Sequence, residues 1–230
     1  MNSIEQLRST YRHTLYDDVV PFWQRYSPDR RHGGFFTCLD RDGSVYSTDK
    51  YLWLQGRPVW MFARLYSEQR DAQWLRLATQ GARFLRRHGR ARDGRVYFAV
   101  TRAGRPIHIQ RKIYSEVFYV LAMIAMYRAS GDSSYRDEGT AMFARIYDLW
   151  RHPARLGRPR LAGAFRGSVL AEPMVFLCML EELAAAGVCA PYARLGRRMI
   201  DRALLHVKPE QERVLEHVGP SGESIQGPLG

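Results

Sequence analysis

The sequence predicts an all-α protein built from helical hairpins, with short β-hairpins in the loops between them. Most of the chain carries apolar residues at helical spacing, two short segments alternate apolar and polar residues, and the units that contain these segments resemble each other. With 230 residues and 46% hydrophobic content, the chain can bury one sizeable core. We therefore expect a single domain over residues 1–230, with a loop-like end over 219–230.

Amphipathic periodicity predicts the helices, and capping residues support several of their ends. Apolar residues recur every three or four positions, as expected for helices that bury one face. Asp132 or Ser133 precedes one helix, Gly131 ends another, and Gly187 closes an alanine-rich run. The expected helices span residues 2–26, 52–69, 72–88, 113–130, 134–151, 169–186 and 191–206.

The two alternating segments predict β-hairpins between helices. Residues 35–46 have Gly43 at the expected turn, and residues 96–107 have Gly104 there. A shift of 61 residues superposes these hairpins and the helices that follow, pairing Gly33 with Gly94, Tyr66 with Tyr127 and Asp71 with Asp132. Helix pairs of this kind stack in an open solenoid or close into a toroid, and the repeat alone leaves both architectures open.

Composition and charge limit where in the cell we expect the protein and which partners we expect it to bind. The longest apolar runs are shorter than the roughly 20 residues that span a bilayer, and the N-terminus lacks the features of a secretory signal. We expect a cytoplasmic protein without a membrane partner. Three cysteines, at 38, 178 and 189, suggest neither a disulfide framework nor a zinc site. The net charge of +12 comes from arginines scattered along the chain, which disfavours nucleic acid as a partner.

The densest group of unusual residues lies at 49–60, DKYLWLQGRPVW, at the start of an expected helix. Gly56 and Pro58 are poor helix formers, which indicates that a backbone or a ligand approaches closely there. Trp53 and Trp60 share a helix face. They belong either to the core or to a groove that binds a flat ligand such as a carbohydrate.

This segment and the one before it resemble the N-acylglucosamine 2-epimerase family, which includes the renin-binding proteins. The resemblance rests first on GGFFTCLDRDG at 33–43 and TDKYLWLQGRPVWMF at 48–62. It continues through 112–118, 127–132, 172–174, 181–183 and 215–218. It implies an (α/α)6 toroid of about twelve helices around a central sugar site. Because the sequence predicts about seven helices, we expect the N-terminal portion of an incomplete toroid.

The resemblance also implies an activity and site residues. Family members invert C2 of a ring-opened sugar, such as N-acylglucosamine or N-acylmannosamine, by removing a proton next to a carbonyl through an enediolate. Arg57 is the expected catalytic residue, because a guanidinium can hold the sugar oxygens; the alternative is an Arg57 that braces the fold through a carboxylate. Tyr114, Met174 and Trp53 are the expected substrate-binding residues, and Tyr114 could instead be a core residue. Met174 favours an acyl-hexosamine or monosaccharide over a disaccharide.

The sequence offers no clear candidates for the acid and the base that would transfer the C2 proton. Two histidines usually serve these roles in the family, and neither has a match in this chain. The seven histidines present are interpreted as structural: 13, 32, 88, 108, 152, 206 and 217. Glu216 matches a family acid. We therefore expect little epimerase activity from this chain alone.

The sequence leaves other functions open. The chain could be a non-catalytic fragment that binds a sugar or a protein. A glycoside hydrolase would need two carboxylates across the cleft, for which Asp49, Glu116 and Glu172 are candidates. No cofactor or nucleotide site is expected, and no metal, because His13 and Asp17 have no evident third ligand. The resemblance is compatible with a homodimer.

Overall fold

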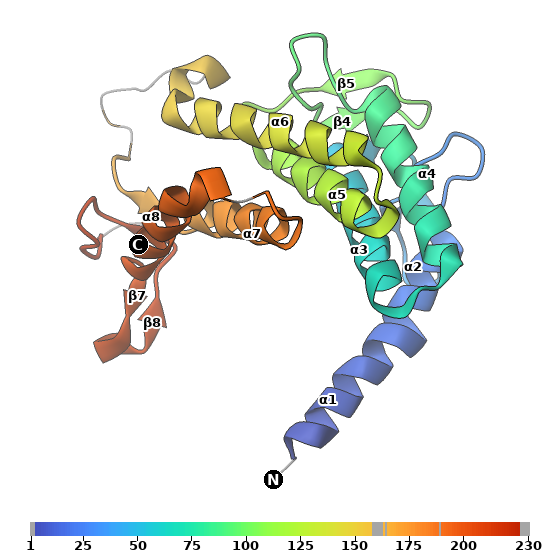
Figure 1. Cartoon of the computed structure of the whole chain (residues 1–230), viewed down its shortest axis with the longest axis horizontal. Coiled ribbons are helices and arrows are strands. Elements are labelled where there is room, and N and C mark those ends of the chain that lie inside the picture. Colours follow the sequence, from blue (N-terminus) through green and yellow to red (C-terminus); the bar gives the residue numbers. More distant parts are fainter. Residues whose placement is uncertain (1–2, 158–162, 164, 189, 226–230) are drawn as a thin grey trace.

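The computed structural model describes residues 3–157, 163, 165–188 and 190–225, and it is mainly helical (Figure 1). Three helical hairpins form the body of the molecule. The helices are α1 (Ile4–His13), α2 (Val20–Tyr26), α3 (Leu52–Gln69), α4 (Ala72–His88), α5 (Tyr114–Ser130), α6 (Ser133–Arg151), α7 (Ala171–Ala185) and α8 (Ala193–Leu204). The expected bounds of α3 and α4 are confirmed, and those of α5 to α8 differ by at most two residues at either end.

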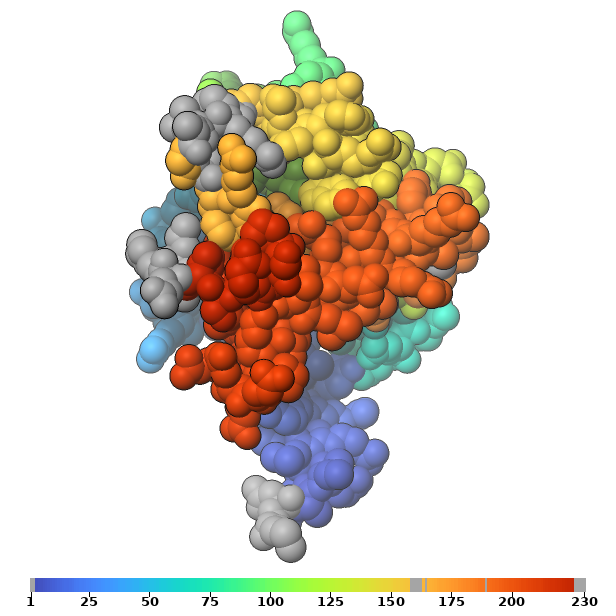
Figure 2. Space-filling model, turned by 90° about the vertical axis from the view of Figure 1, so that its left-hand side faces the viewer, coloured from blue at the N-terminus to red at the C-terminus, as the bar shows by residue number. Residues whose placement is uncertain are grey.

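The expected helix over 2–26 is observed as continuous helix over 4–26, but it is not α-helical throughout. A π-helical turn at Thr14–Val19 separates α1 from α2, and the Val20 N–H bonds the Leu15 carbonyl, five residues back. Pro21 lies in the first turn of α2. Its ring has no N–H and crowds the carbonyl four residues earlier, so the wider turn before it accommodates the proline. Helix α1 has no buried residue and projects from the body (Figures 1 and 2).

The turns between paired helices confirm the internal repeat. Helix α3 ends at Arg70 and α5 ends at Gly131, both in the left-handed conformation with φ of 61° and 75°. Asp71 then caps α4 by accepting from the Gln73 N–H, and Asp132 caps α6 in the same way from Ser134. The two connections are therefore one structural unit repeated 61 residues apart.

The helices form two rows. Helix α3 packs against α4 and α5, α5 against α6 and α7, and α7 against α8, so α3, α5 and α7 form one row and α4, α6 and α8 the other (Figure 1). Between α3 and α5, a Cβ on Gly56 would lie 2.6 Å from the Phe118 carbonyl oxygen. The expected close approach at Gly56 is thus confirmed, and the approaching group is the α5 backbone. The core runs through these contacts and includes Phe62, Met123, Ile124, Phe143 and Phe176.

Short strands lie in the loops, as expected. The first hairpin pairs β1 (Cys38–Leu39) with β2 (Val45–Ser47), and a sheet of order β3-β4-β5 joins β3 (Lys50–Tyr51), β4 (Ala99–Val100) and β5 (Pro106–His108). The sequence did not predict that β3 joins the second hairpin. Two further antiparallel pairs are β6 (Ser168–Val169) with β9 (His217–Val218) and β7 (Val207–Lys208) with β8 (Arg213–Val214). Because β3 runs directly into α3, this sheet fixes where α3 begins.

Several expectations concern features outside these elements. Residues 219–225 contain no helix, and 226–230 lie outside the described residues. Cys38 and Cys178 are free thiols, whereas Cys189 also lies outside the described part. No helix in the described ranges has the length and hydropathy needed to cross a bilayer.

Candidate functional site

Arg57 packs against two aromatic rings near the start of α3. Its guanidinium carbon lies 4.7 Å from the Trp53 ring centroid, one turn earlier, and 4.6 Å from that of Phe118 on α5. The two rings also contact each other, with centroids 6.0 Å apart, so together they form an aromatic corner against which the guanidinium packs. Within the described residues no carboxylate pairs with Arg57, so the expected alternative of a brace is not supported.

A pocket of about 720 Å³ opens beside Arg57 and is called here the Arg57 pocket. Its walls come from α3, α5 and α7, together with Trp23 of α2 and Thr37 of the first hairpin. The Thr37 hydroxyl is buried and has no hydrogen-bond partner within the described part of the chain. The pocket thus offers aromatic and aliphatic surface together with a free guanidinium and a free hydroxyl, a combination typical of small-molecule sites.

A buried carboxylate closes one end of this pocket. Glu182 of α7 accepts hydrogen bonds from Trp60 Nε1 at 2.7 Å, from Arg64 at 2.8 Å and from Arg128 at 3.0 Å. These donors come from α3 and α5, so one side chain links all three helices that line the pocket. Sequence reasoning missed this role, although Trp60 and Arg64 are four residues apart and therefore share a face of α3.

Lys50, in the same 49–60 segment as Arg57, has a structural role. The Lys50 ammonium is fully buried and lies 3.0 Å from Asp29, which Arg102 also binds through two nitrogens at 2.9 and 3.1 Å. Burial opposes ionisation of Asp29, but these cations hold its pKa far below the ordinary value. Burial lowers the pKa of Lys50, and Asp29 opposes that shift. This cluster ties the loop before β1 to the sheet beside α3.

Of the other expected substrate-binding residues, Tyr114 and Met174 do not line the Arg57 pocket. Tyr114 opens α5 and lines a second cavity of about 610 Å³, which shares no lining residue with the Arg57 pocket. Burial, with a smaller effect of Glu172 and Glu216, raises the pKa of the Tyr114 phenol. Met174 is 51% exposed on α7 and lines neither cavity. Trp53 contacts the Arg57 guanidinium but is not among the described residues that line the Arg57 pocket.

One of the carboxylates considered for a glycoside hydrolase is buried and already bonded. Glu116 is fully buried and accepts from Arg95 Nε at 2.6 Å and from the Val96 N–H at 3.0 Å. A carboxylate held in this way is not available to a substrate in an open cleft. Glu172 lines the cavity of Tyr114, where Glu116 has no place. The structure therefore excludes Glu116 as a catalytic carboxylate of a glycoside hydrolase.

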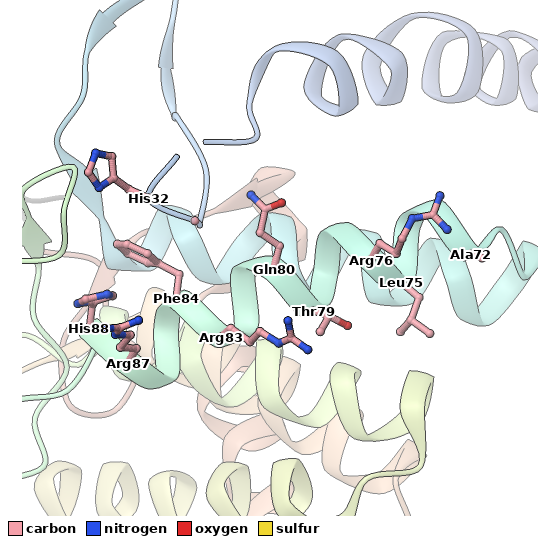
Figure 3. Close-up of a pocket in the computed structure, with 11 residues that line it drawn as sticks. His32, Ala72, Leu75, Arg76, Thr79, Gln80, Arg83, Phe84, Arg87 and His88 are labelled. Carbon is pink, nitrogen blue, oxygen red and sulfur yellow. The ribbon is translucent and has the colours of Figure 1, made fainter. Parts of the chain in front are cut away.

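The histidines lie away from Arg57. None of the described residues lining the Arg57 pocket is a histidine. His206 is buried and bonded to Ser168 Oγ and the Leu215 carbonyl, which supports a structural role. His32 and His88 lie at one end of a groove of about 670 Å³ along α4, beside a row formed by Arg76, Arg83 and Arg87 (Figure 3). Those arginines are exposed on the outer row of helices, apart from the Arg57 pocket.

The fold defines a class of protein when it is compared with solved structures. A crystal structure of a sugar epimerase from a ruminal bacterium superposes with a TM-score of 0.79 over 94% of this chain and 60% of that one, at 19% sequence identity. The fold is therefore that of the (α/α)6 toroid, of which this chain forms part.

The sequence comparisons identify the family. The model of the N-acylglucosamine 2-epimerase family matches residues 34–218. N-acylglucosamine 2-epimerase of Homo sapiens is 44% identical over 222 residues, which are 93% of this chain and 52% of that protein; the Mus musculus protein is 42% identical over 93% and 53%. This chain belongs to the N-acylglucosamine 2-epimerase family, and the expected resemblance is confirmed. It spans about half the length of these curated relatives.

Proposed function

We propose that this chain forms the Arg57 side of a sugar 2-epimerase site. The substrate is a ring-opened N-acylglucosamine, N-acylmannosamine or related hexose, whose C2 configuration is inverted. The observation that carries the proposal is the Arg57 guanidinium, packed against Trp53 and Phe118 with no carboxylate partner in the described structure, in a pocket of about 720 Å³. Family membership supports the reaction type, since the matched relatives are named as 2-epimerases.

The proposed chemistry needs a fixed positive group more than a mobile one. A base removes the proton from C2, the carbonyl oxygen gains negative charge as the enediolate forms, and an acid returns a proton to the opposite face of C2. A guanidinium already oriented by two rings stabilises the developing oxyanion without reorganising. Its paired N–H groups can bind two neighbouring sugar oxygens at once. Arg57 therefore has the proposed roles of binding the sugar and stabilising the enediolate.

The acid and the base are proposed to be groups other than the described residues that line the Arg57 pocket. An imidazole suits both directions of transfer near neutral pH, and no histidine is found among the described lining residues. The chain alone should therefore bind the sugar while exchanging its C2 proton slowly or not at all. The alternative function, a non-catalytic sugar-binding or protein-binding fragment, predicts the same absence of exchange.

The remaining proposals concern the substrate and the surroundings. Met174 is proposed to favour an acyl-hexosamine or monosaccharide over a disaccharide. We also propose a cytoplasmic location and a homodimer, for which α1 offers exposed apolar side chains at Ile4, Leu7 and Tyr11. Light scattering of the purified chain would test the dimer through its mass.

One NMR experiment in deuterium oxide tests the main proposal. The purified chain is mixed with N-acetylmannosamine, and saturation transfer reports binding while the intensity of the C2 proton reports exchange. We expect saturable binding without loss of the C2 signal. Absence of binding would contradict the proposed site. Rapid loss of the C2 signal would support epimerase chemistry but contradict the statement that the acid and base lie elsewhere.

A further inference from the structure

The outer surface of α4 carries a groove of about 670 Å³, called here the α4 groove. Its lining residues follow α4 from the first turn to the last (Figure 3). Among them are three exposed arginines, Arg76, Arg83 and Arg87, called here the groove arginines. Spacings of seven and four residues place their side chains on one side of the helix, so they form a continuous basic row.

The walls of the α4 groove are held in place by contacts within the protein. Gln80 Nε2 donates to the Gly34 carbonyl at 3.1 Å, and this bond joins α4 to the loop that contributes His32. Phe84 is almost fully buried, and its ring centroid lies 4.9 Å from that of His88. The groove is therefore formed before any ligand binds, which reduces the free energy needed to order it.

The positive charge of the α4 groove is not neutralised by the rest of the described structure. Among the described helices of ten residues or more, α4 alone contains no Asp or Glu. Arg86 pairs with Glu138 at 3.0 Å, whereas no described carboxylate pairs with any of the groove arginines. Burial, together with the charges of Arg87 and Lys50, lowers the pKa of His88. This end of the groove therefore disfavours a further cation and favours an anion.

Helix stability does not account for the basic row. A cation in the last turn interacts favourably with the helix dipole, and Arg87 lies in that turn. Arg76 and Arg83 lie before the last turn, where this effect is small. Like charges four residues apart repel each other, as Arg83 and Arg87 do. The row thus lowers the stability of the free helix, a pattern expected for a surface that meets an anionic partner.

The length of the basic row disfavours a compact anion. Arg76 and Arg87 lie at the two ends of the row, about 16 Å apart along the axis of α4 at the ordinary rise per residue. A single phosphate or carboxylate group can contact only one or two of the groove arginines. A ligand that contacts all three must extend along α4, as about three turns of helix or about five residues of extended chain would do.

The α4 groove has apolar walls beside the basic row. Ala72 and Leu75 line it toward one end, and Phe84 lines it toward the other (Figure 3). A protein segment can supply both carboxylates for the arginines and aliphatic side chains for these walls, whereas a nucleic acid has no aliphatic side chains. We propose that the α4 groove docks an acidic, amphipathic segment of a partner protein. The groove shares no lining residue with the Arg57 pocket, so this inference does not depend on the proposed function.

Binding of a designed peptide tests this surface. The probe is a fluorescein-labelled peptide of about twelve residues in which Glu and Leu recur at helical spacing, long enough to cover the basic row. Fluorescence anisotropy at physiological ionic strength measures its affinity, because salt screens weak attraction to the rest of this basic chain. We expect saturable one-to-one binding. A second peptide, with Ser in place of each Leu, should bind at least about tenfold more weakly, because it cannot fill the apolar walls.

Two double variants with the same change in net charge locate the binding. Arg76→Gln combined with Arg83→Gln removes two groove arginines and should weaken peptide binding by about tenfold or more, since two charge-assisted hydrogen bonds are lost. Arg194→Gln combined with Arg197→Gln removes two exposed arginines of α8 and is the control. The control should change the affinity by less than about twofold, because charges away from the peptide are screened.

Four outcomes would overturn the inference. No saturable binding would contradict a docking surface, and equal weakening in both double variants would show only a general attraction to a basic protein. Equal affinity for the Ser-containing peptide would indicate a site for any polyanion. Release of the peptide by micromolar tripolyphosphate would indicate a site for a compact anion. The test is separate from the proposed function, because Arg57→Met should bind the peptide as the wild type does.

Discussion

The side-chain amide of Gln55 exchanges two hydrogen bonds with the backbone of Phe35. Its oxygen accepts from the Phe35 N–H at 2.8 Å, and its nitrogen donates to the Phe35 carbonyl at 2.7 Å. Both residues are fully buried. Gln55 lies two residues before Arg57 on α3, so this pairing joins the loop before the first hairpin to the turn of α3 that presents the guanidinium.

The first prediction concerns this pairing. Gln55→Leu leaves the Phe35 N–H and carbonyl buried without partners, which should lower the free energy of unfolding by about 3 kcal/mol. Urea unfolding followed by circular dichroism measures the change. Gln69→Leu at the exposed end of α3 is the control and should change stability by less than about 0.5 kcal/mol. Equal stability of the two variants would contradict the role assigned to Gln55.

The second prediction concerns the contact between α3 and α5. Gly56→Ala places a methyl group 2.6 Å from the Phe118 carbonyl oxygen, so the helices must separate, and we expect a loss of about 2 kcal/mol. In Gly196→Ala on α8 the added methyl group meets Leu180 at 3.9 Å, an ordinary contact. That control should gain about 0.5 to 1 kcal/mol from helix propensity. A stabilising Gly56→Ala, measured by the same urea titration, would disprove the close packing.

The third prediction concerns the carboxylate that links the pocket helices. Glu182→Gln removes the charge that Arg64 and Arg128 share, and should cost about 2 kcal/mol, less than for a fully buried pair because both arginines are partly exposed. Glu181→Gln, its exposed neighbour, should have little effect. The midpoints of thermal unfolding of both variants test this prediction. Equal midpoints would contradict a structural role for Glu182.

The fourth prediction concerns pH. Lys50 and Arg102 hold the folded-state pKa of Asp29 below the ordinary value of 3.8. A depressed carboxyl pKa contributes stability that is fully present above the unfolded-state pKa and is lost as pH falls through the folded-state pKa. The wild-type chain should therefore lose stability steeply below about pH 4, and Asp29→Asn should be less stable at neutral pH with a shallower acid dependence.

Urea midpoints measured from neutral to acidic pH test this pH dependence. Asp201→Asn, on an exposed face of α8, serves as the control and should keep the wild-type slope. The interpretation fails if Asp29→Asn retains the full acid dependence of the wild type.

The sequence predicted the helical hairpins well because their signals are local. Periodicity located α3 and α4, and capping residues such as Asp132 marked the helix starts. The π-helical turn before Pro21 was missed because the apolar pattern continues through it. The pairing of β3 with β4 was missed because it joins segments about 50 residues apart in sequence, a separation that strand alternation does not encode.

The candidate site was predicted in part. Arg57 and Trp53 were selected from one motif and do lie together. Phe118, Glu182 and Thr37 were not singled out, because their place at the pocket depends on how α5, α7 and the first hairpin pack against α3. Tyr114 was selected by resemblance as a substrate-binding residue, which stays a prediction, and the structure places it in a different cavity from the Arg57 pocket.

The role of Arg57 in sugar binding is tested most directly by substituting it. N-acetylmannosamine is titrated into the 5-fluorotryptophan-labelled chain, and the Trp60 signal gives the affinity of the Arg57 pocket. Arg57→Met should weaken binding by at least about tenfold. The affinity of Arg57→Lys should lie between those of the wild type and Arg57→Met, because an ammonium keeps the charge but loses the planar fork. Arg41→Met, at an exposed position before the turn of the first hairpin, should bind as the wild type does. Wild-type affinity in Arg57→Met would contradict the account.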